Sequence, residues 1–147
     1  MALGTDMARL RTLPVLSCLD EDALRLVAFS AEARALPSGH LLFRRGDPTD
    51  GAVLVVSGAL ALDTGHGDTR AIRPVGPGTL LDESALLAPG FRSATTTAAG
   101  TTTTVAIPRS AMMRVLEAYP SNAVALRRYW AERLSRRLDA FKAATRP

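Results

Sequence analysis

The sequence predicts a mainly β domain flanked by helices, and two observations carry that prediction. Turn-forming glycine and proline residues recur roughly every 7 to 13 residues from Gly39 to Pro108, with strand-like runs between them. On both sides of this region the apolar residues change to helical spacing. The 147 residues are 47% hydrophobic and 22% charged, which suits one domain over residues 1–147 with a core at about 13–119.

Two helices are expected in the N-terminal part of the chain. Residues 7–10 favour a short helix that closes before Pro14. Asp20 is a candidate N-cap, and Leu19 and Leu24 on either side of it have the spacing of a hydrophobic staple. A second helix is therefore expected from Asp20 to about Ala31.

The central region predicts short antiparallel strands of a sandwich or barrel. The expected strands are 41–43, 52–56, 59–62, 69–72, 95–98 and 101–107. The last two are rich in threonine and flank Gly100, so we expect them to pair with each other.

The C-terminal part predicts two more helices. Pro108 suits a first helical turn, and Pro120 stops the helix that follows it. The last helix covers about residues 121–143 and carries an apolar stripe. Nine basic and three acidic residues lie from Arg109 onward, which we interpret as the solvated face of this helix, with binding to nucleic acid or an acidic partner as the alternative.

Composition favours a cytoplasmic protein without a membrane segment. The sequence contains no apolar run near the roughly 18 residues of a membrane span, and its N-terminus lacks the pattern of a secretory signal. Cys18 is the single cysteine, so an internal disulfide is excluded and a reducing compartment is expected.

Residues 78–95 interrupt the strand pattern and contain the candidate ligand-binding residues. A short helical piece from Glu83 to Leu87 is followed by renewed strand at Arg92. Backbone N–H groups at a helix start attract a phosphate, and an arginine folded back over them adds a charged clamp. A neighbouring carboxylate accepts a sugar hydroxyl, so the pattern indicates a cyclic nucleotide. The alternative is a loop salt bridge, since Glu and Arg nine residues apart are common.

These residues resemble the cyclic-nucleotide-binding domain family of catabolite activator proteins, protein kinase regulatory subunits and cyclic-nucleotide-gated channels. The family's phosphate-binding cassette reads approximately Gly-Glu-Leu-Ala-Leu, a few variable residues, then Arg-Ala/Ser/Thr-Ala. Here it reads 82–86, 87–91 and 92–94, and Glu83 precedes Arg92 by the usual nine residues. The turns near Gly39, Gly46-Asp47 and 76–78, and the valine-rich run 53–58, also match, so the resemblance covers about residues 13–143.

The resemblance implies a non-catalytic jelly roll (a double-stranded β-helix) with N-terminal helices and two C-terminal helices. Glu83 would bind the ribose 2′-hydroxyl, and Arg92 with backbone amides near Ala85 and Leu86 would hold the phosphate. Ser93 would contact phosphate or purine. The full candidate site is Asp82, Glu83, Ser84, Ala85, Leu86, Arg92, Ser93 and Ala94.

The resemblance also implies how the signal leaves the domain. The last helix would move over the base as a lid, with Trp130, Tyr129 and Leu134 as stacking candidates. For Trp130 the alternative is simple packing of the helix. The ligand is expected to be cyclic AMP rather than cyclic GMP, on family prevalence. Further partners are an unidentified protein or a missing effector domain, and a second copy through the last helix.

Two departures keep a second function open. Asp82 replaces the family's glycine and Ser84 its leucine. We expect Asp82 to cap the short helix and to bring a second negative charge near the phosphate. A degenerate domain that binds proteins without nucleotide is therefore the main alternative.

Two further classes are less favoured. A metal-dependent jelly-roll enzyme needs several His and carboxylate ligands on strands, whereas His40 and His66 are the only histidines and fall at turns. We therefore expect neither a metal nor catalysis. Binding of nucleic acid is also less favoured, because the sequence shows no element suited to reading a nucleic-acid groove.

Overall fold

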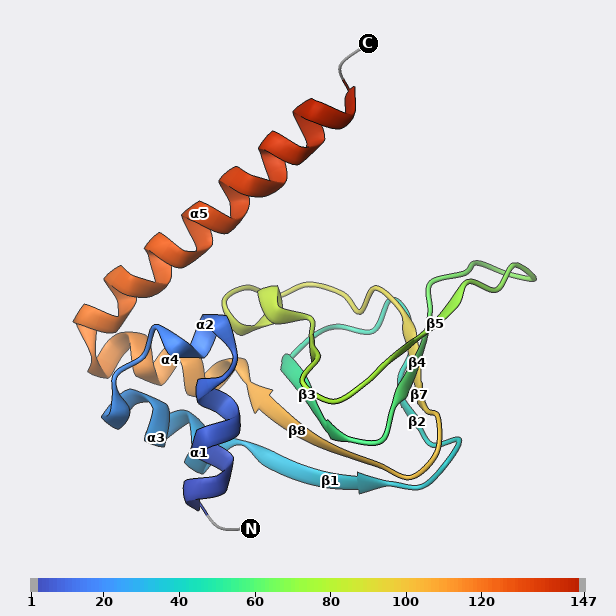
Figure 1. Cartoon of the computed structure of the whole chain (residues 1–147), viewed down its shortest axis with the longest axis horizontal. Helices are drawn as coiled ribbons and strands as arrows, with labels where there is room; N and C mark the ends of the chain where they lie inside the picture. The colour runs from blue at the N-terminus through green and yellow to red at the C-terminus, as the bar shows by residue number, and fades with distance from the viewer. Residues whose placement is uncertain (1–2, 146–147) are drawn as a thin grey trace. The chain divides into compact units, whose positions relative to one another are not determined.

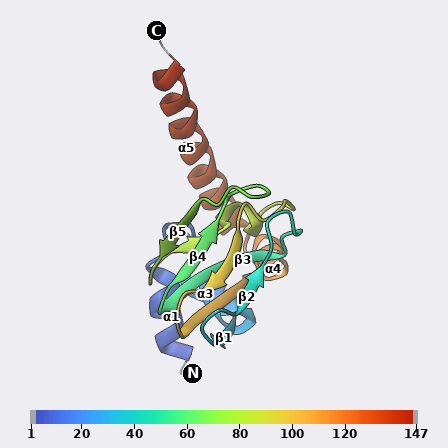
Figure 2. The ribbon, with the colours of Figure 1, turned by 90° about the vertical axis from the view of Figure 1, so that its right-hand side faces the viewer.

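Antiparallel strands between residues 32 and 108 form two four-stranded sheets (Figure 1). The computed structural model describes residues 3–145. One sheet has the order β1-β8-β3-β6 and the other the order β2-β7-β4-β5, so the predicted jelly roll with flanking helices is confirmed. Figure 2 shows the strands from a second direction. The strands are β1 Glu32–Leu36, β2 Leu41–Phe43, β3 Gly51–Ser57, β4 Leu60–Asp63, β5 Ile72–Val75, β6 Leu80–Leu81, β7 Thr95–Ala98 and β8 Thr102–Pro108.

The helices lie at both ends of the described chain, apart from one short piece in the middle. They are α1 Leu3–Arg11, α2 Pro14–Ser17, α3 Glu21–Ser30, the 3₁₀-helix η1 Glu83–Leu86, α4 Arg109–Ala118 and α5 Pro120–Thr145. The chain divides into two compact units. Residues 29–113 form one, here called the sheet unit. The residues up to 28 and those from 114 onward form the other, here called the helical unit. The expected single domain over 1–147 stays a prediction.

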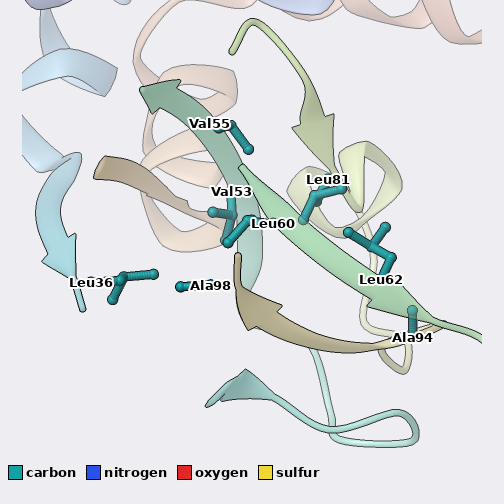
Figure 3. Close-up of a cluster of buried hydrophobic side chains, with 8 residues drawn as sticks. All are labelled: Leu36, Val53, Val55, Leu60, Leu62, Leu81, Ala94 and Ala98. Carbon is teal, nitrogen blue, oxygen red and sulfur yellow. The ribbon is translucent and has the colours of Figure 1, made fainter. Parts of the chain in front are cut away.

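The core of the sheet unit contains side chains from both sheets (Figure 3). On β4, Leu60 and Leu62 are buried while Ala61 between them is half-buried, as the alternation of a strand requires. Burial of each such leucine or valine contributes roughly 1.5–3 kcal/mol. The cluster consists of Leu36, Val53, Val55, Leu60, Leu62, Leu81, Ala94 and Ala98.

In the helical unit, the predicted cap of α3 is confirmed. Asp20 Oδ1 accepts a hydrogen bond from the Ala23 N–H at 2.9 Å. Asn122 at the start of α5 is buried and bonds Asp20 twice, accepting from its backbone N–H at 2.8 Å and donating to Oδ2 at 2.8 Å. The Ala23 N–H and then the Asn122 amide hold the pKa of Asp20 below its ordinary value.

The last helix, α5, begins at Pro120, which also ends α4 as expected. Its apolar stripe divides into two parts, because Leu126 is buried whereas Leu134, Leu138 and Phe141 are at least half exposed. Within residues 3–145, no helix has both the length and the apolar character needed to cross a bilayer.

Two strand predictions are wrong. The strand expected at 69–72 lies at Ile72–Val75 instead, because the carboxylate of Asp63 accepts bonds from the N–H groups of Gly65 and Ala71 and so closes a longer hairpin loop. The two threonine-rich strands do not pair: β7 pairs with β2 and β4, and β8 with β1 and β3. Between them the chain passes from one sheet to the other, and the Thr102 hydroxyl fixes this crossing by donating to the carbonyl of Ala59 at 2.8 Å.

Candidate functional site

The cassette, residues 82–94, begins with an unusual backbone. Asp82 follows β6 with φ 57° and ψ 48°, and among the described residues it is the one non-glycine with positive φ. This left-handed conformation reverses the chain into η1 (Glu83–Leu86). The chain then returns through Phe91, which forms an isolated antiparallel bridge with Pro48, and so delivers Arg92 beside the β2–β3 loop.

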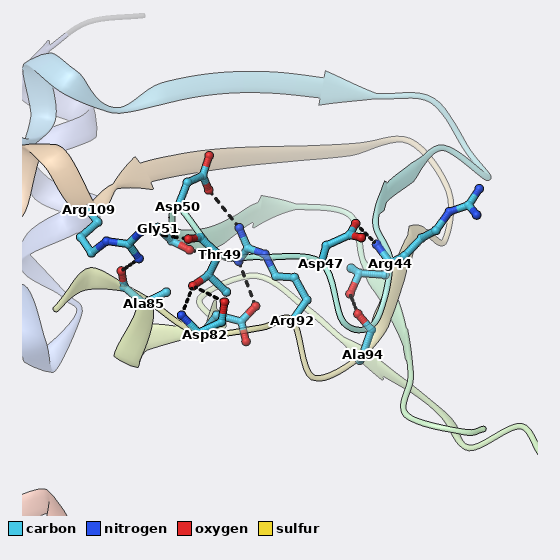
Figure 4. A network of polar contacts seen from close by, with 12 residues as sticks. Arg44, Asp47, Thr49, Asp50, Gly51, Asp82, Ala85, Arg92, Ala94 and Arg109 are labelled. Carbon is cyan, nitrogen blue, oxygen red and sulfur yellow. Dashed lines mark hydrogen bonds and ion pairs between the residues drawn. The ribbon is translucent and has the colours of Figure 1, made fainter. Parts of the chain in front are cut away.

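The side chain of Arg92 is buried, with 6% of its surface exposed (Figure 4). Its Nη1 donates to the carbonyl of Gly51 at 3.0 Å and to Asp82 Oδ2 at 3.0 Å. Its Nη2 donates to Asp50 Oδ1 at 3.1 Å. The guanidinium also lies 4.1 Å from the ring centroid of Phe43, a cation–π distance.

The two carboxylates differ in their surroundings. The side chain of Asp50 is 95% exposed, whereas that of Asp82 is 18% exposed. A buried guanidinium needs a counter-charge and hydrogen-bond acceptors, and the two carboxylates together with the Gly51 carbonyl supply them to Nη1 and Nη2. Because Asp50 faces solvent, its pairing with Arg92 is well screened. Asp82 is thus the more enclosed counter-charge.

The cassette is fastened to the β2–β3 loop by further contacts. Thr49 is buried, and its backbone N–H donates to Gly90 O at 2.9 Å while Gly90 N–H donates to its hydroxyl at 3.1 Å. The guanidinium of Arg109, at the start of α4, donates to the carbonyls of Ala85 at 3.1 Å, Ala88 at 3.3 Å and Thr49 at 3.0 Å. Arg109 therefore joins the β2–β3 loop to η1 and to Ala88, two residues after it.

Phe43 lines two separate hollows of the sheet unit. The smaller, here called the cavity, has a volume of about 180 Å³, below the roughly 300–1,000 Å³ typical of small-molecule sites. The larger, here called the groove, has about 660 Å³ and is lined by Arg92 and Asp50 among others. The cavity is lined by Phe43, Leu62, Arg73, Thr79, Leu80, Leu81, Asp82, Ser93, Ala94 and Thr96.

The structure brings part of the predicted site together. Asp82, Ser93 and Ala94 share the cavity, and Asp82 contacts Arg92. The backbone N–H of Ala85, expected to hold a phosphate, donates instead to the carbonyl of Asp82 at 2.9 Å. Among the other predicted residues, Leu86 is buried, Glu83 is half-buried and Ser84 is exposed.

The expected capping role of Asp82 is wrong. Its side chain makes no capping hydrogen bond to η1. The left-handed backbone and the nearby guanidinium explain the difference, because the carboxylate reaches Arg92 Nη1 at 3.0 Å instead.

Sequence reasoning missed three groups that contact the cassette: the Asp50 carboxylate and the Gly51 carbonyl at Arg92, and the Arg109 guanidinium at Ala85 and Ala88. Asp50 lies 42 residues from Arg92 in the sequence, and no local pattern links the two. The one feature of the sequence that could have pointed to Asp50 is its place directly before the apolar run of β3.

The predicted lid residues belong to the helical unit, whereas the cassette belongs to the sheet unit. Within α5, Tyr129 and Trp130 pack edge to face with ring centroids 5.5 Å apart. Leu134 is 59% exposed. The lid stays a prediction.

Comparisons with known proteins bear on this site. Residues 33–119 match the family described as the cyclic nucleotide-binding domain. An uncharacterized NTE family protein of Mycobacterium tuberculosis is 30% identical over 145 residues, which cover 98% of this chain and 24% of that protein. The Cyclic AMP receptor protein of Thermus thermophilus is 31% identical over 123 residues, 82% of this chain and 57% of that protein.

Solved structures agree with the sequence matches. The N-terminal domain of a transcriptional regulator from Streptomyces coelicolor superposes with a TM-score of 0.81 at 32% identity, covering 90% of this chain and 94% of that one. The chain therefore spans about a quarter of the mycobacterial relative but nearly all of the Streptomyces domain.

Proposed function

Because the chain belongs to the cyclic nucleotide-binding domain family, we propose that it is a regulatory module whose ligand is a cyclic nucleotide, cyclic AMP in preference to cyclic GMP. The name of the Thermus relative, Cyclic AMP receptor protein, supports the choice of nucleotide. The Streptomyces match, a domain of a transcriptional regulator, supports a regulatory role without catalysis in this part of the chain.

The observation that carries the proposal is the buried guanidinium of Arg92 at the end of the cassette. A planar guanidinium is suited to bidentate recognition of a phosphate. The Gly51 carbonyl and Phe43 hold it in place without using its whole donor set. In this role Arg92 anchors the cyclic phosphate, Glu83 binds the ribose 2′-hydroxyl, and Ser93 contacts phosphate or purine from the cavity wall.

The proposed output is movement of α5. A ligand shifts this helix only if it contacts the helix differently in two positions, so Trp130, Tyr129 or Leu134 would touch the base in one of them. The exposed apolar residues Leu134, Leu138 and Phe141 suit a contact with a second copy or with a protein partner. An effector within the same polypeptide is the alternative recipient of this movement, because the chain spans 24% of the mycobacterial relative.

Calorimetry with cyclic AMP and cyclic GMP tests the proposal. We expect saturable heat for the natural chain and a loss of about 30-fold to several thousandfold in affinity for Arg92→Ala, equivalent to about 2–5 kcal/mol. Arg92→Lys keeps the positive charge, so it shows whether a loss of affinity in Arg92→Ala comes from misfolding. Arg25→Ala, on the exposed face of α3, is the matched control and should leave the affinity unchanged. Absence of heat with either nucleotide at millimolar concentration would reject the proposal.

A second candidate is a domain that kept the fold and serves as a protein-binding scaffold without nucleotide. The ion pair between Asp82 and Arg92 favours it, because a protein carboxylate occupies the donor that a phosphate would use. The same titration separates the two candidates.

A further inference from the structure

Asp82 has a conformation that a glycine would adopt more easily. Its φ of 57° is in the left-handed region, which is unfavourable for side chains other than those of Asn and Asp. The family's cassette has a glycine at this position. Here the carboxylate compensates by bonding Arg92 Nη1 at 3.0 Å while only 18% of the Asp82 side chain is exposed.

Asp82 and a phosphate compete for the same donor. The Nη1 atom of an arginine carries two N–H groups, and here one bonds the Gly51 carbonyl and the other Asp82 Oδ2. A phosphate oxygen therefore reaches Nη1 only after Asp82 has left it. Asp50 is a different kind of partner, because it bonds Nη2 and its side chain is 95% exposed, so it can turn into solvent.

The position of Asp82 relative to the cavity adds a second effect. Asp82 lines the cavity together with Ser93 and Ala94, whereas Arg92 lines the groove. Within the cavity lining Asp82 is the one carboxylate and Arg73 the one cation, so an anion held beside Ser93 and Ala94 lies near the Asp82 charge. Like charges brought together in a poorly solvated site repel each other strongly.

We propose that Asp82 is a built-in competitor of the nucleotide phosphate, occupying Arg92 in the empty state and raising the nucleotide concentration at which the domain responds. The inference rests on the proposed function and deepens it. It explains why the chain keeps the family's arginine at Arg92 although Asp82 replaces the family's glycine. The carboxylate of Asp82 weakens nucleotide binding without abolishing the site.

Titration of Asp82 variants with cyclic AMP and cyclic GMP tests the competitor role. Asp82→Gly removes the carboxylate and relieves the backbone, and Asp82→Asn removes the charge while keeping the shape and the tolerance of positive φ. We expect both to bind nucleotide about 10- to 100-fold more tightly than the natural chain. Asp68→Asn, which removes an exposed charge, is the matched control and leaves affinity unchanged.

The outcomes separate this inference from the proposed function. If the natural chain binds nucleotide and neither Asp82 variant binds more tightly, the competitor role is wrong and the proposed function stands. If no variant binds either nucleotide, both fall. Tight binding by the Asp82 variants alone supports the competitor role and rejects nucleotide binding as the function of the natural chain.

A measurement without nucleotide checks the pairing itself. In a double-mutant cycle of Asp82→Asn and Arg92→Met followed by urea unfolding, we expect the double variant to be less destabilised than the sum of the two single variants. Additive effects would mean that Asp82 and Arg92 do not interact in solution and would overturn the inference by themselves.

Discussion

Replacing Arg109 by methionine should loosen the cassette from the β2–β3 loop. The guanidinium donates three hydrogen bonds to carbonyls, and those to Ala85 and Thr49 are partly buried. Two bonds from a charged donor are worth about 3–6 kcal/mol if nothing replaces them. Arg109 is half-buried, so water recovers part of this, and we expect a loss of about 2–4 kcal/mol in the free energy of unfolding.

Urea unfolding followed by circular dichroism measures the loss. Arg109→Lys is the matched variant: it keeps the cation, but its single ammonium lacks the planar fork that spans the three carbonyls, so an intermediate loss is expected. Arg44→Met removes an exposed guanidinium and should change stability by less than about 0.5 kcal/mol (Figure 4).

Amide hydrogen exchange supplies a local readout. The N–H groups of Thr49 and Gly90 bond across the junction that Arg109 secures, so they should exchange faster in Arg109→Met while the amides between β1 and β8 keep their protection. A stability change below about 0.5 kcal/mol, or unchanged exchange at these two amides, would refute the clamp role of Arg109.

Three further predictions concern the fold. Leu60→Ala, at a fully buried core position, should lower the free energy of unfolding by about 2–5 kcal/mol in urea titration, whereas Leu134→Ala at an exposed position should change it little. Gly51→Ala should lower it by about 3 kcal/mol, since a Cβ there would lie 2.0 Å from the backbone oxygen of Ile107, and Gly76→Ala, with open space, is its control. The pKa of Asp20 is lowered in the folded state, so the ionised carboxylate stabilises the fold above the ordinary pKa of 3.8, and this stabilisation is lost as the pH falls through the lowered pKa. Asp20→Asn should therefore lose less stability than the natural chain on acidification in that range. An unchanged dependence of stability on pH would contradict the capping role of Asp20.

Local signals in the sequence were sufficient for elements whose ends are fixed locally. The cap of α3 by Asp20 and the boundary between α4 and α5 at Pro120 depend on neighbouring residues, and both predictions are confirmed. The short helical piece after Asp82 was also predicted and is present as η1.

Long-range partners were not predictable in this way. The strands on either side of Gly100 have similar composition, and nothing local shows that one joins β4 and the other β3. The strand β1 was missed because its sequence, Glu-Ala-Arg-Ala-Leu, contains no β-branched or aromatic residue.

The candidate site shows the same division between local and distant information. The resemblance of residues 82–94 to the family's cassette, including the interval from Glu83 to Arg92, pointed to the site. The partner of Asp82 depended on a backbone conformation that composition does not reveal, and Asp50 and Arg109 reach the cassette from distant segments.

The pairing of β8 with both β1 and β3 imposes an order on biosynthesis. Residues 32–57 leave the ribosome well before Thr102–Pro108, so β1 and the edge of β3 that pairs with β8 stay unpaired until β8 is made, whereas the other edge of β3 pairs with the earlier β6. Contacts this far apart in sequence close slowly. Nascent chains stalled before residue 102 should therefore be recognised by chaperones or proteases, while those that expose residue 108 become protected in a single step.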